Sequence, residues 1–198
     1  MKRFFTAFVS AVILIMVLIE DCRAQYFSKY DGTPWLVQVN GGMASFQNYT
    51  SSYFVPVVGS VALKYSVTDK LALLGMAECS MFSDALVNMS IYSFSIGPNL
   101  NMARIVNIND LGAWIWNIYG TLGAFSSDIQ DNGLVFNFGS DFGYWVNKKI
   151  GIIASIKSSM LMMGDPKLLS KIGRSQQVFS LGFVIAIGSS KGHVDYNY

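Results

Sequence analysis

The sequence predicts an all-β fold, an eight-stranded antiparallel up-and-down transmembrane β-barrel, and three observations carry this prediction. Apolar residues make up 52% of the 198 residues, while charged residues supply only 13%, roughly half of the share that is usual in soluble proteins. After the N-terminal segment, no apolar run is long enough for a transmembrane helix. Polar and apolar residues instead alternate with a period of two, which is typical of strands that have one face against an apolar phase.

The N-terminal segment 1–24 is predicted to be a secretory signal peptide. Lys2 and Arg3 precede an apolar stretch at 4–19, and a small residue, Ala24, offers a cleavage site. The alternative is a membrane anchor, but the stretch is shorter than the roughly 20 residues that span a bilayer. The rest of the chain is expected to form two parts, a barrel at 25–188 and a polar periplasmic C-terminal tail at 189–198.

Eight segments place large apolar side chains on one parity and small or polar side chains on the other. Each is close to the 9 to 11 or so residues that a tilted membrane strand needs. In chain order, with one residue of the apolar face and one of the polar face, the predicted strands are 35–46 (Val39, Asn40), 55–68 (Val61, Lys64), 71–82 (Leu73, Glu78), 92–102 (Phe94, Ser95), 114–124 (Leu122, Thr121), 134–146 (Phe138, Asn137), 150–160 (Ile152, Ser155) and 179–187 (Phe183, Ser180).

The bulky face is expected to point outward, into lipid. The interior of an eight-stranded barrel is just wide enough to be filled by side chains, and the polar parity is mostly small. A soluble barrel of the lipocalin kind would place the apolar face inside and needs a charged exterior, for which this chain has few residues.

The connections between the predicted strands alternate in length. Outer-membrane barrels have short periplasmic turns and longer outer loops, and an even number of strands brings both termini to the short-turn side, so we expect both in the periplasm. The compact turns are expected at 67–70, 107–111 and 146–149, and the longer loops at 47–53, 83–89, 126–133 and 163–176.

Aromatic residues near the strand ends predict two interfacial girdles of the kind that flank the apolar band of membrane barrels. At the short-turn end these are Trp35, Trp114, Trp116 and Trp145 with Tyr65 and Tyr144. At the opposite rim they are Phe46, Tyr49, Tyr53, Phe54, Phe82, Tyr92 and Phe125.

This pattern resembles the small eight-stranded outer-membrane barrels that include the OmpA membrane domain, OmpX and OmpW. Two hairpin turns, at 65–71 and 144–150, repeat one another and resemble the turns of PorT-like barrels of Bacteroidota. The segment 180–187 resembles the insertion signal that the barrel-assembly machinery binds, which implies that machinery as a partner, although here the chain continues beyond it. The positions that match the signal are Ser180, Gly182, Ile185 and Ile187.

Four charged residues fall on the inward parity away from turns: Lys64, Glu78, Asp141 and Lys157. Each would be costly in a narrow lumen without a partner. Lys64 and Glu78 lie on neighbouring strands, as do Asp141 and Lys157, so these are the predicted pairs. The pairs either fill the lumen or line a gated ion path.

Other chemistry is not expected. One histidine, His193, and one cysteine of the mature chain, Cys79, are too few for the usual zinc ligand sets, and no cofactor is expected. Barrel enzymes that act on lipid A resemble acyl transferases or hydrolases with a histidine at the outer rim, whereas His193 lies in the predicted tail, so we do not expect an enzyme. A net charge of +2 with scattered cations disfavours nucleic acid as a partner.

The expected function is that of a structural or accessory subunit of a larger bacterial envelope assembly in the outer membrane, in contact with lipid and lipopolysaccharide. Three cations of the last long loop, Lys167, Lys171 and Arg174, are candidates for contacts with lipopolysaccharide phosphates or a partner. The alternatives are a narrow pore or lateral transport route for small molecules, and a soluble periplasmic binding module.

Overall fold

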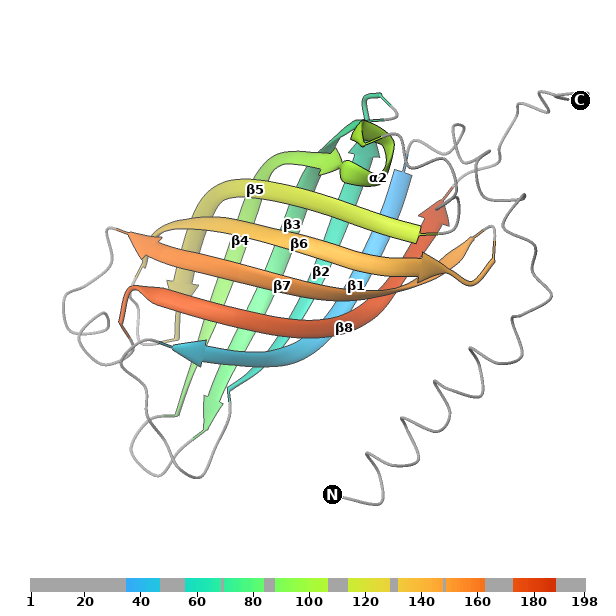
Figure 1. The fold of residues 1–198 in the computed structure, drawn as a ribbon. Coiled ribbons are helices and arrows are strands. Elements are labelled where there is room, and N and C mark those ends of the chain that lie inside the picture. The colour runs from blue at the N-terminus through green and yellow to red at the C-terminus, as the bar shows by residue number, and fades with distance from the viewer. Residues whose placement is uncertain are drawn as a thin grey trace, which may run out of the picture.

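Eight antiparallel strands form a closed barrel in which each strand pairs with its neighbours in the sequence and β1 pairs with β8 (Figure 1). The computed structural model describes residues 35–46, 56–68, 70–83, 88–106, 114–128, 132–147, 149–162 and 173–187. The predicted signal peptide and tail lie outside the described residues. The strands are β1 Trp35–Phe46, β2 Val57–Ser66, β3 Leu71–Ser83, β4 Asn88–Asn101, β5 Trp114–Ser127, β6 Asn132–Trp145, β7 Ile150–Met162 and β8 Ser175–Ile187.

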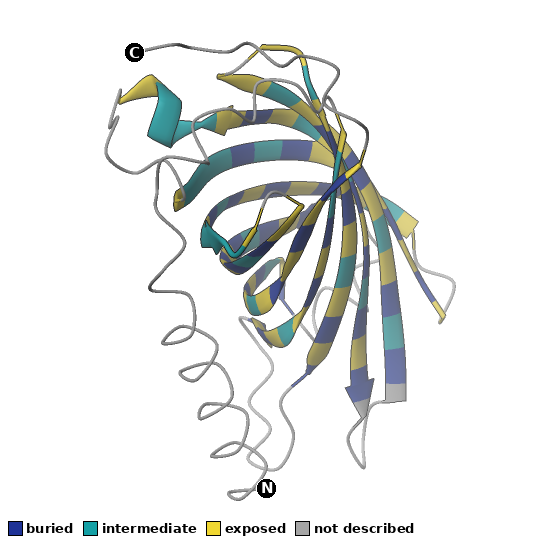
Figure 2. Cartoon of the chain, turned by 90° about the vertical axis from the view of Figure 1, so that its right-hand side faces the viewer, coloured by how far each residue is buried: buried dark blue, intermediate teal, exposed yellow. Residues whose placement is uncertain are grey.

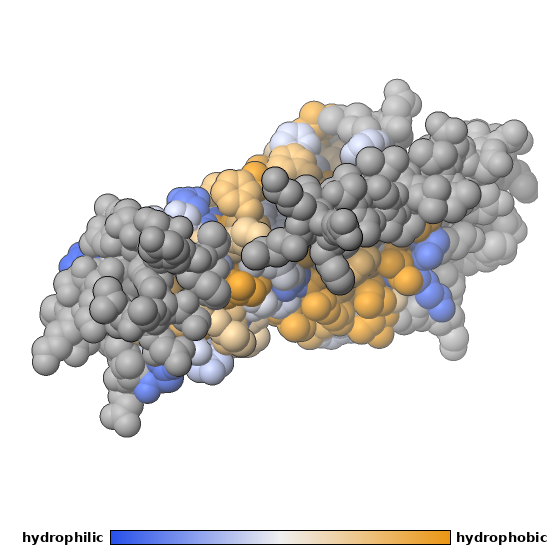
Figure 3. Space-filling model, turned by 90° about the horizontal axis from the view of Figure 1, so that it is seen from below, coloured by the Kyte–Doolittle hydropathy of each residue, from blue (hydrophilic) through white to orange (hydrophobic). Residues whose placement is uncertain are grey.

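The predicted fold class and the predicted directions of the two strand faces are confirmed. Val61, Phe94, Phe138 and Phe183 are all more than half exposed on the outer wall, and buried and exposed residues alternate along every strand (Figure 2). On the face shown in Figure 3, the described residues over the middle of the barrel are mostly hydrophobic. The outer wall is therefore apolar, and the polar side chains of each strand point into the interior. A soluble barrel has the reverse arrangement.

Three predicted connections differ in length from the structure. The expected loops 83–89 and 126–133 shrink to 84–87 and 128–131 because strands β3 to β6 extend into them. At that rim the Asp128 carboxylate accepts a hydrogen bond from Ser90 N at 2.8 Å, and Asp128 N donates to Ser90 O at 3.1 Å, which extends the pairing of β4 with β5.

The expected compact turn 107–111 is instead part of a long connection, 102–113, which begins with the short helix α2, Met102–Ile105. Asn101 ends β4 and caps this helix, since its Oδ1 accepts a hydrogen bond from Arg104 N at 3.3 Å. Loop length alone therefore does not distinguish the two ends of this barrel. Within the described residues, no helix is long and apolar enough to span a membrane.

The two repeated turns have the same hydrogen-bonding pattern. Thr68 Oγ1 accepts from Lys70 N at 3.3 Å and from Leu71 N at 3.0 Å. Asn147 Oδ1 accepts from the backbone N–H groups of the equivalent two residues, Lys149 at 2.8 Å and Ile150 at 2.9 Å. A short polar side chain at this position replaces a backbone acceptor and tightens the hairpin, which explains the repeat in physical terms.

One aromatic girdle is present at the end of the barrel that carries these turns. Trp35 packs on Tyr65 with ring centroids 4.7 Å apart, and Trp114 packs on Tyr144 at 5.4 Å. Both tryptophans are exposed on the outer wall. The girdle predicted at the opposite rim is mostly wrong. Of its described residues, Phe46, Phe82 and Phe125 are buried and only Tyr92 is exposed on the outer wall.

Candidate functional site in the barrel lumen

The four charges of the inward parity all lie inside the barrel. Lys64 on β2, Glu78 on β3, Asp141 on β6 and Lys157 on β7 are buried, and Asp141 is 0% exposed. Charges buried to this degree are costly unless each finds a partner and the remaining polar atoms are hydrogen-bonded. The lumen charges therefore define the candidate site.

Both ion pairs span the lumen. Lys64 Nζ lies 2.7 Å from Asp141 Oδ2, and Lys157 Nζ contacts Glu78 Oε2. In the ring of eight strands, β2 lies opposite β6 and β3 lies opposite β7. Each salt bridge therefore ties together two walls that are not hydrogen-bonded to each other.

The predicted pairs, Lys64 with Glu78 and Asp141 with Lys157, are wrong, and for the first pair the reason is strand register. Lys64 lies opposite Leu74 on β3, while Glu78 lies opposite Ser60 on β2, an offset of four residues or about 13 Å along a strand. In a barrel of eight strands the facing wall is within reach of a lysine side chain. The lysines therefore pair across the lumen rather than along the wall.

Asp141 has further hydrogen bonds from two other strands. Ser155 Oγ on β7 donates to Asp141 Oδ1 at 2.6 Å, and Gln38 Nε2 on β1 donates to the same oxygen at 3.4 Å. The carboxylate therefore joins groups from β1, β2, β6 and β7. This fully buried carboxylate thus links strands on different sides of the barrel through hydrogen bonds.

A second polar cluster is formed by uncharged side chains from three consecutive strands. Asn137 Nδ2 donates to Ser95 Oγ and to Thr121 Oγ1, each at 3.0 Å, and Thr121 Oγ1 donates to Ser95 Oγ at 2.9 Å. On other walls, Gln176 Nε2 donates to Ser80 Oγ at 3.0 Å. These groups fill the lumen with hydrogen bonds between side chains, as a narrow barrel requires.

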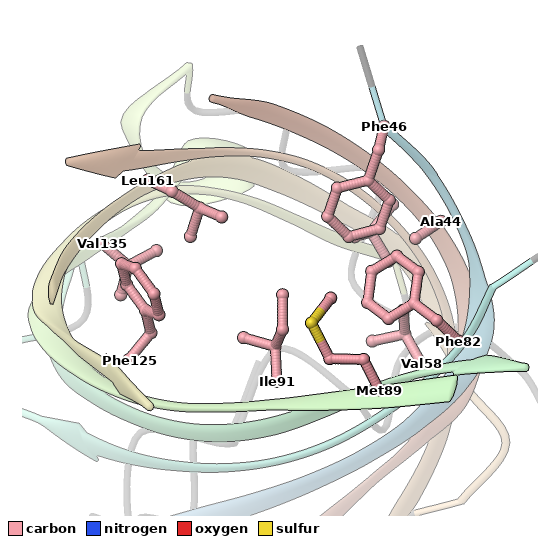
Figure 4. Packing of buried hydrophobic residues seen from close by; sticks show 10 residues of the cluster. Ala44, Phe46, Val58, Phe82, Met89, Ile91, Phe125, Val135 and Leu161 are labelled. Atoms are coloured by element: carbon pink, nitrogen blue, oxygen red, sulfur yellow. The ribbon is translucent and has the colours of Figure 1, made fainter. Parts of the chain in front are cut away.

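An apolar plug closes the end of the lumen opposite the repeated turns (Figure 4). Phe46 and Phe82, expected on the outer rim, point inward and their ring centroids are 4.5 Å apart, and Phe125 is also buried. Of the other residues predicted for that girdle, Tyr92 is exposed on the outer wall, and Tyr49, Tyr53 and Phe54 lie outside the described residues. The residues of the apolar plug are Ala44, Phe46, Val58, Phe82, Met89, Ile91, Phe125, Val135, Leu161 and Val178.

The sequence carries a signal for this plug in the parity of its phenylalanines. Phe46 has the parity of Asn40, Phe82 that of Glu78, and Phe125 that of Thr121. Strand periodicity places all three inside the barrel. The preference of aromatic residues for the membrane interface points the other way, and at these three positions parity prevails.

A second apolar cluster, of Ala62, Leu74, Met76 and Tyr119, lies beside the ion pairs. Leu74 pairs with Lys64, and Tyr119 pairs with Gly139, which is the register partner of Lys157. The Tyr119 ring covers Gly139, where a Cβ atom would collide with it. At the end of the lumen that carries the repeated turns there is a small cavity of about 60 Å³, lined by Leu36, Lys64, Ser66, Thr68, Leu71, Ala72, Asn99, Asn101 and Asn117.

The other candidate residues lie on or near β8. Gly182 faces inward, where a Cβ atom would collide with the Val39 carbonyl oxygen of β1, while Ile185 and Ile187 point outward. Ser180 is half-buried, and Arg174 is exposed just before the strand. Lys167 and Lys171 lie outside the described residues. Among the described residues, no group of three or more His, Cys, Asp or Glu side chains is placed to hold a metal ion.

Comparison with solved structures supports the fold through the neisserial surface protein A. No protein-family model matches the chain, and no curated protein sequence matches it. Among solved structures, the neisserial surface protein A superposes with a TM-score of 0.61 at 9% identity, covering 79% of this chain and 99% of that one. Ail of Yersinia pestis and the N-terminal barrel domain of Pseudomonas aeruginosa OprF each give a TM-score of 0.48, at 16% and 12% identity, each covering 79% of this chain and 99% of the other. This chain has the fold of the small eight-stranded outer-membrane β-barrels.

Proposed function

We propose that this protein is an outer-membrane barrel with a side-chain-filled lumen, which acts as a structural or accessory subunit of a larger bacterial envelope assembly. The observation that carries the proposal is the pair of salt bridges across the lumen beneath an apolar plug. Because side chains link the opposite walls and fill the lumen, we expect partners to bind the outer wall or the two ends of the barrel.

The membrane location is supported by the outer surface. A closed barrel satisfies the backbone hydrogen bonds of every strand, which a bilayer requires, and the exposed side chains of the wall are largely apolar. Trp and Tyr side chains prefer the level of lipid headgroups, and two pairs of them lie at one end of the barrel. The ends of β1 and β8 meet there, beside the turns 67–70 and 146–149, and we propose that this end and both termini face the periplasm.

The proposed partners follow from this location. The wall contacts outer-membrane lipid, and Arg174, with Lys167 and Lys171, is proposed to contact lipopolysaccharide phosphates or a protein partner. During insertion, the barrel-assembly machinery would bind β8 through Ser180, Gly182, Ile185 and Ile187. The larger assembly is proposed to engage the ends of the barrel.

A narrow pore is the second candidate, favoured by the polar half of the lumen and by the small cavity that reaches Lys64. In this version the ion pairs are a gate, and charge reversal at Lys157 would change conductance without unfolding the barrel. In the accessory version the same change only destabilises the barrel.

Two measurements distinguish these functions. The native protein is purified in mild detergent and the proteins that accompany it are identified, with an unrelated outer-membrane barrel as the control. The purified barrel is then tested in planar bilayers. A reproducible companion complex and silent bilayers are expected. Discrete channels from the pure protein would refute the accessory role, and extraction without detergent would refute the membrane location.

A further inference from the structure

The outer wall of the barrel has an apolar groove. It has a volume of about 300 Å³ and is lined by Trp35, Leu63, Tyr65, Leu73, Gly75 and Ile96. These residues come from four adjacent strands, β1 to β4. All of them except Gly75 are exposed large apolar or aromatic side chains, so the groove opens toward the surroundings of the barrel and not toward the lumen.

Gly75 creates the groove by lacking a side chain. It has the outward parity of β3 and lies opposite Leu63 on β2 and Ile96 on β4. A Cβ atom at Gly75 would have no atom within 4 Å, so the floor is open, and the two larger side chains form the walls. The Trp35 and Tyr65 rings, tilted by 52° relative to each other, lie at one end.

The corresponding place on the far side of the barrel is built differently. There Trp114 and Tyr144 form the matching aromatic pair. Phe142 corresponds to Leu63, and its ring stacks on Trp116 with centroids 5.9 Å apart. Ala154, the residue opposite Phe142, corresponds to Gly75. This second place serves as an internal comparison for the groove, because it has the same kind of aromatic pair but large stacked rings beside it.

We propose that this groove binds one acyl chain of a phospholipid in the leaflet that borders Trp35 and Tyr65. The inference rests on the proposed membrane location. The groove is continuous with the apolar wall that acyl chains would cover, and its volume is at the lower end of the range for small-molecule sites. Trp and Tyr side chains prefer the level of lipid headgroups.

Charge complementarity supports a phospholipid as the occupant. Lys70 is exposed in the turn that joins β2 to β3, the two strands that carry Tyr65 and Leu73. A cation in the turn at this end of the barrel suits the anionic phosphate of the same lipid molecule. The site thus combines an apolar slot for the chain, aromatic rings for the interface and a cation for the headgroup.

A matched pair of glycine variants tests the groove. Gly75→Leu fills its floor. Gly59→Leu adds the same side chain at another outward glycine that has nothing within 4 Å of its Cβ position and does not line the groove. The full chain is purified from membranes in mild detergent and weighed by native mass spectrometry. One retained phospholipid is expected in the wild type and in Gly59→Leu, with loss of that phospholipid in Gly75→Leu.

Fluorescence provides a second readout that does not depend on retention. Two variants each keep one tryptophan, Trp35 or Trp114, with phenylalanine at the other three positions. A phosphatidylethanolamine with brominated acyl chains is added to each in detergent micelles, at about one molecule per barrel. Quenching of Trp35 should exceed quenching of Trp114, although Trp114 is the more exposed of the two, 55% against 41%.

Three outcomes would overturn the inference. These are equal phospholipid retention in both glycine variants, stronger quenching of Trp114, or a mass showing a second copy of the chain in place of lipid. The proposed function is checked separately by flotation with phosphatidylethanolamine vesicles. A barrel that floats but shows one of these three outcomes refutes the groove alone, whereas a barrel that does not float refutes the membrane location itself.

Discussion

Replacing Asp141 by asparagine should destabilise the barrel through the lysine that it leaves behind. Asp141→Asn keeps the volume and can still accept from Ser155, but removes the negative charge 2.7 Å from Lys64 Nζ. Lys64 is itself buried, and removing one partner of a buried ion pair costs about 3–5 kcal/mol. We expect the lower end of this range, because Lys64 also lines the small cavity at the turn end and can extend its ammonium group into it.

A double-mutant cycle isolates the pair. Lys64→Met removes the stranded charge, so Lys64→Met with Asp141→Asn should be more stable than Asp141→Asn alone, with a coupling energy of about 2–3 kcal/mol. The same cycle between Lys64 and Glu78, with Glu78→Gln, should give coupling below about 0.5 kcal/mol, because Lys64 bonds across the lumen and not along the wall.

The assay is reversible urea unfolding of the barrel in phospholipid vesicles, followed by tryptophan fluorescence. Lys149→Met, an exposed turn lysine, is the control and should change the unfolding free energy by less than about 0.5 kcal/mol. Stronger coupling of Lys64 to Glu78 than to Asp141 would refute the cross-lumen arrangement.

Three further predictions concern packing and turns. Phe82→Ala should lower the unfolding free energy by about 3–5 kcal/mol because it opens the apolar plug, whereas Tyr92→Ala on the outer wall should cost less in the same urea titration. Gly182→Ala should reduce the fraction of closed barrel seen as heat-modifiable mobility on gels, because the new Cβ would collide with β1, while Gly41→Ala, with open space, should match the wild type. Thr68→Ala removes two hydrogen bonds to the turn backbone and should cost about 1 kcal/mol; an unchanged urea midpoint would contradict that account of the turn.

Strand parity, together with the shortage of charged residues, predicts the barrel, the outward face and the polar residues of the lumen. Val61, Phe94, Phe138 and Phe183 point outward as predicted, because the side-chain period of a strand is two whatever the register. The same rule also places the phenylalanines of the apolar plug inside the barrel. The interface prediction is wrong for these phenylalanines, because parity and not residue type sets which face of a strand a side chain occupies.

The pairing of the lumen charges could not be predicted in this way. Parity placed Lys64, Glu78, Asp141 and Lys157 on the inward face, but a partner depends on distances through space. Those distances follow from register and from closure of the ring, which bring β2 to face β6 across the lumen. Loop lengths likewise depend on how far the strands extend. At Asp128, for example, the carboxylate accepts a hydrogen bond from Ser90 N on the neighbouring strand.

Local alternation and the shortage of charge are enough to tell which side chains face outward and which face the interior of this barrel. The ion pairs between opposite walls, the apolar plug at one end and the groove over Gly75 on the outer wall become visible only in the folded barrel. These features join residues from different strands, which come together only when the sheet closes on itself.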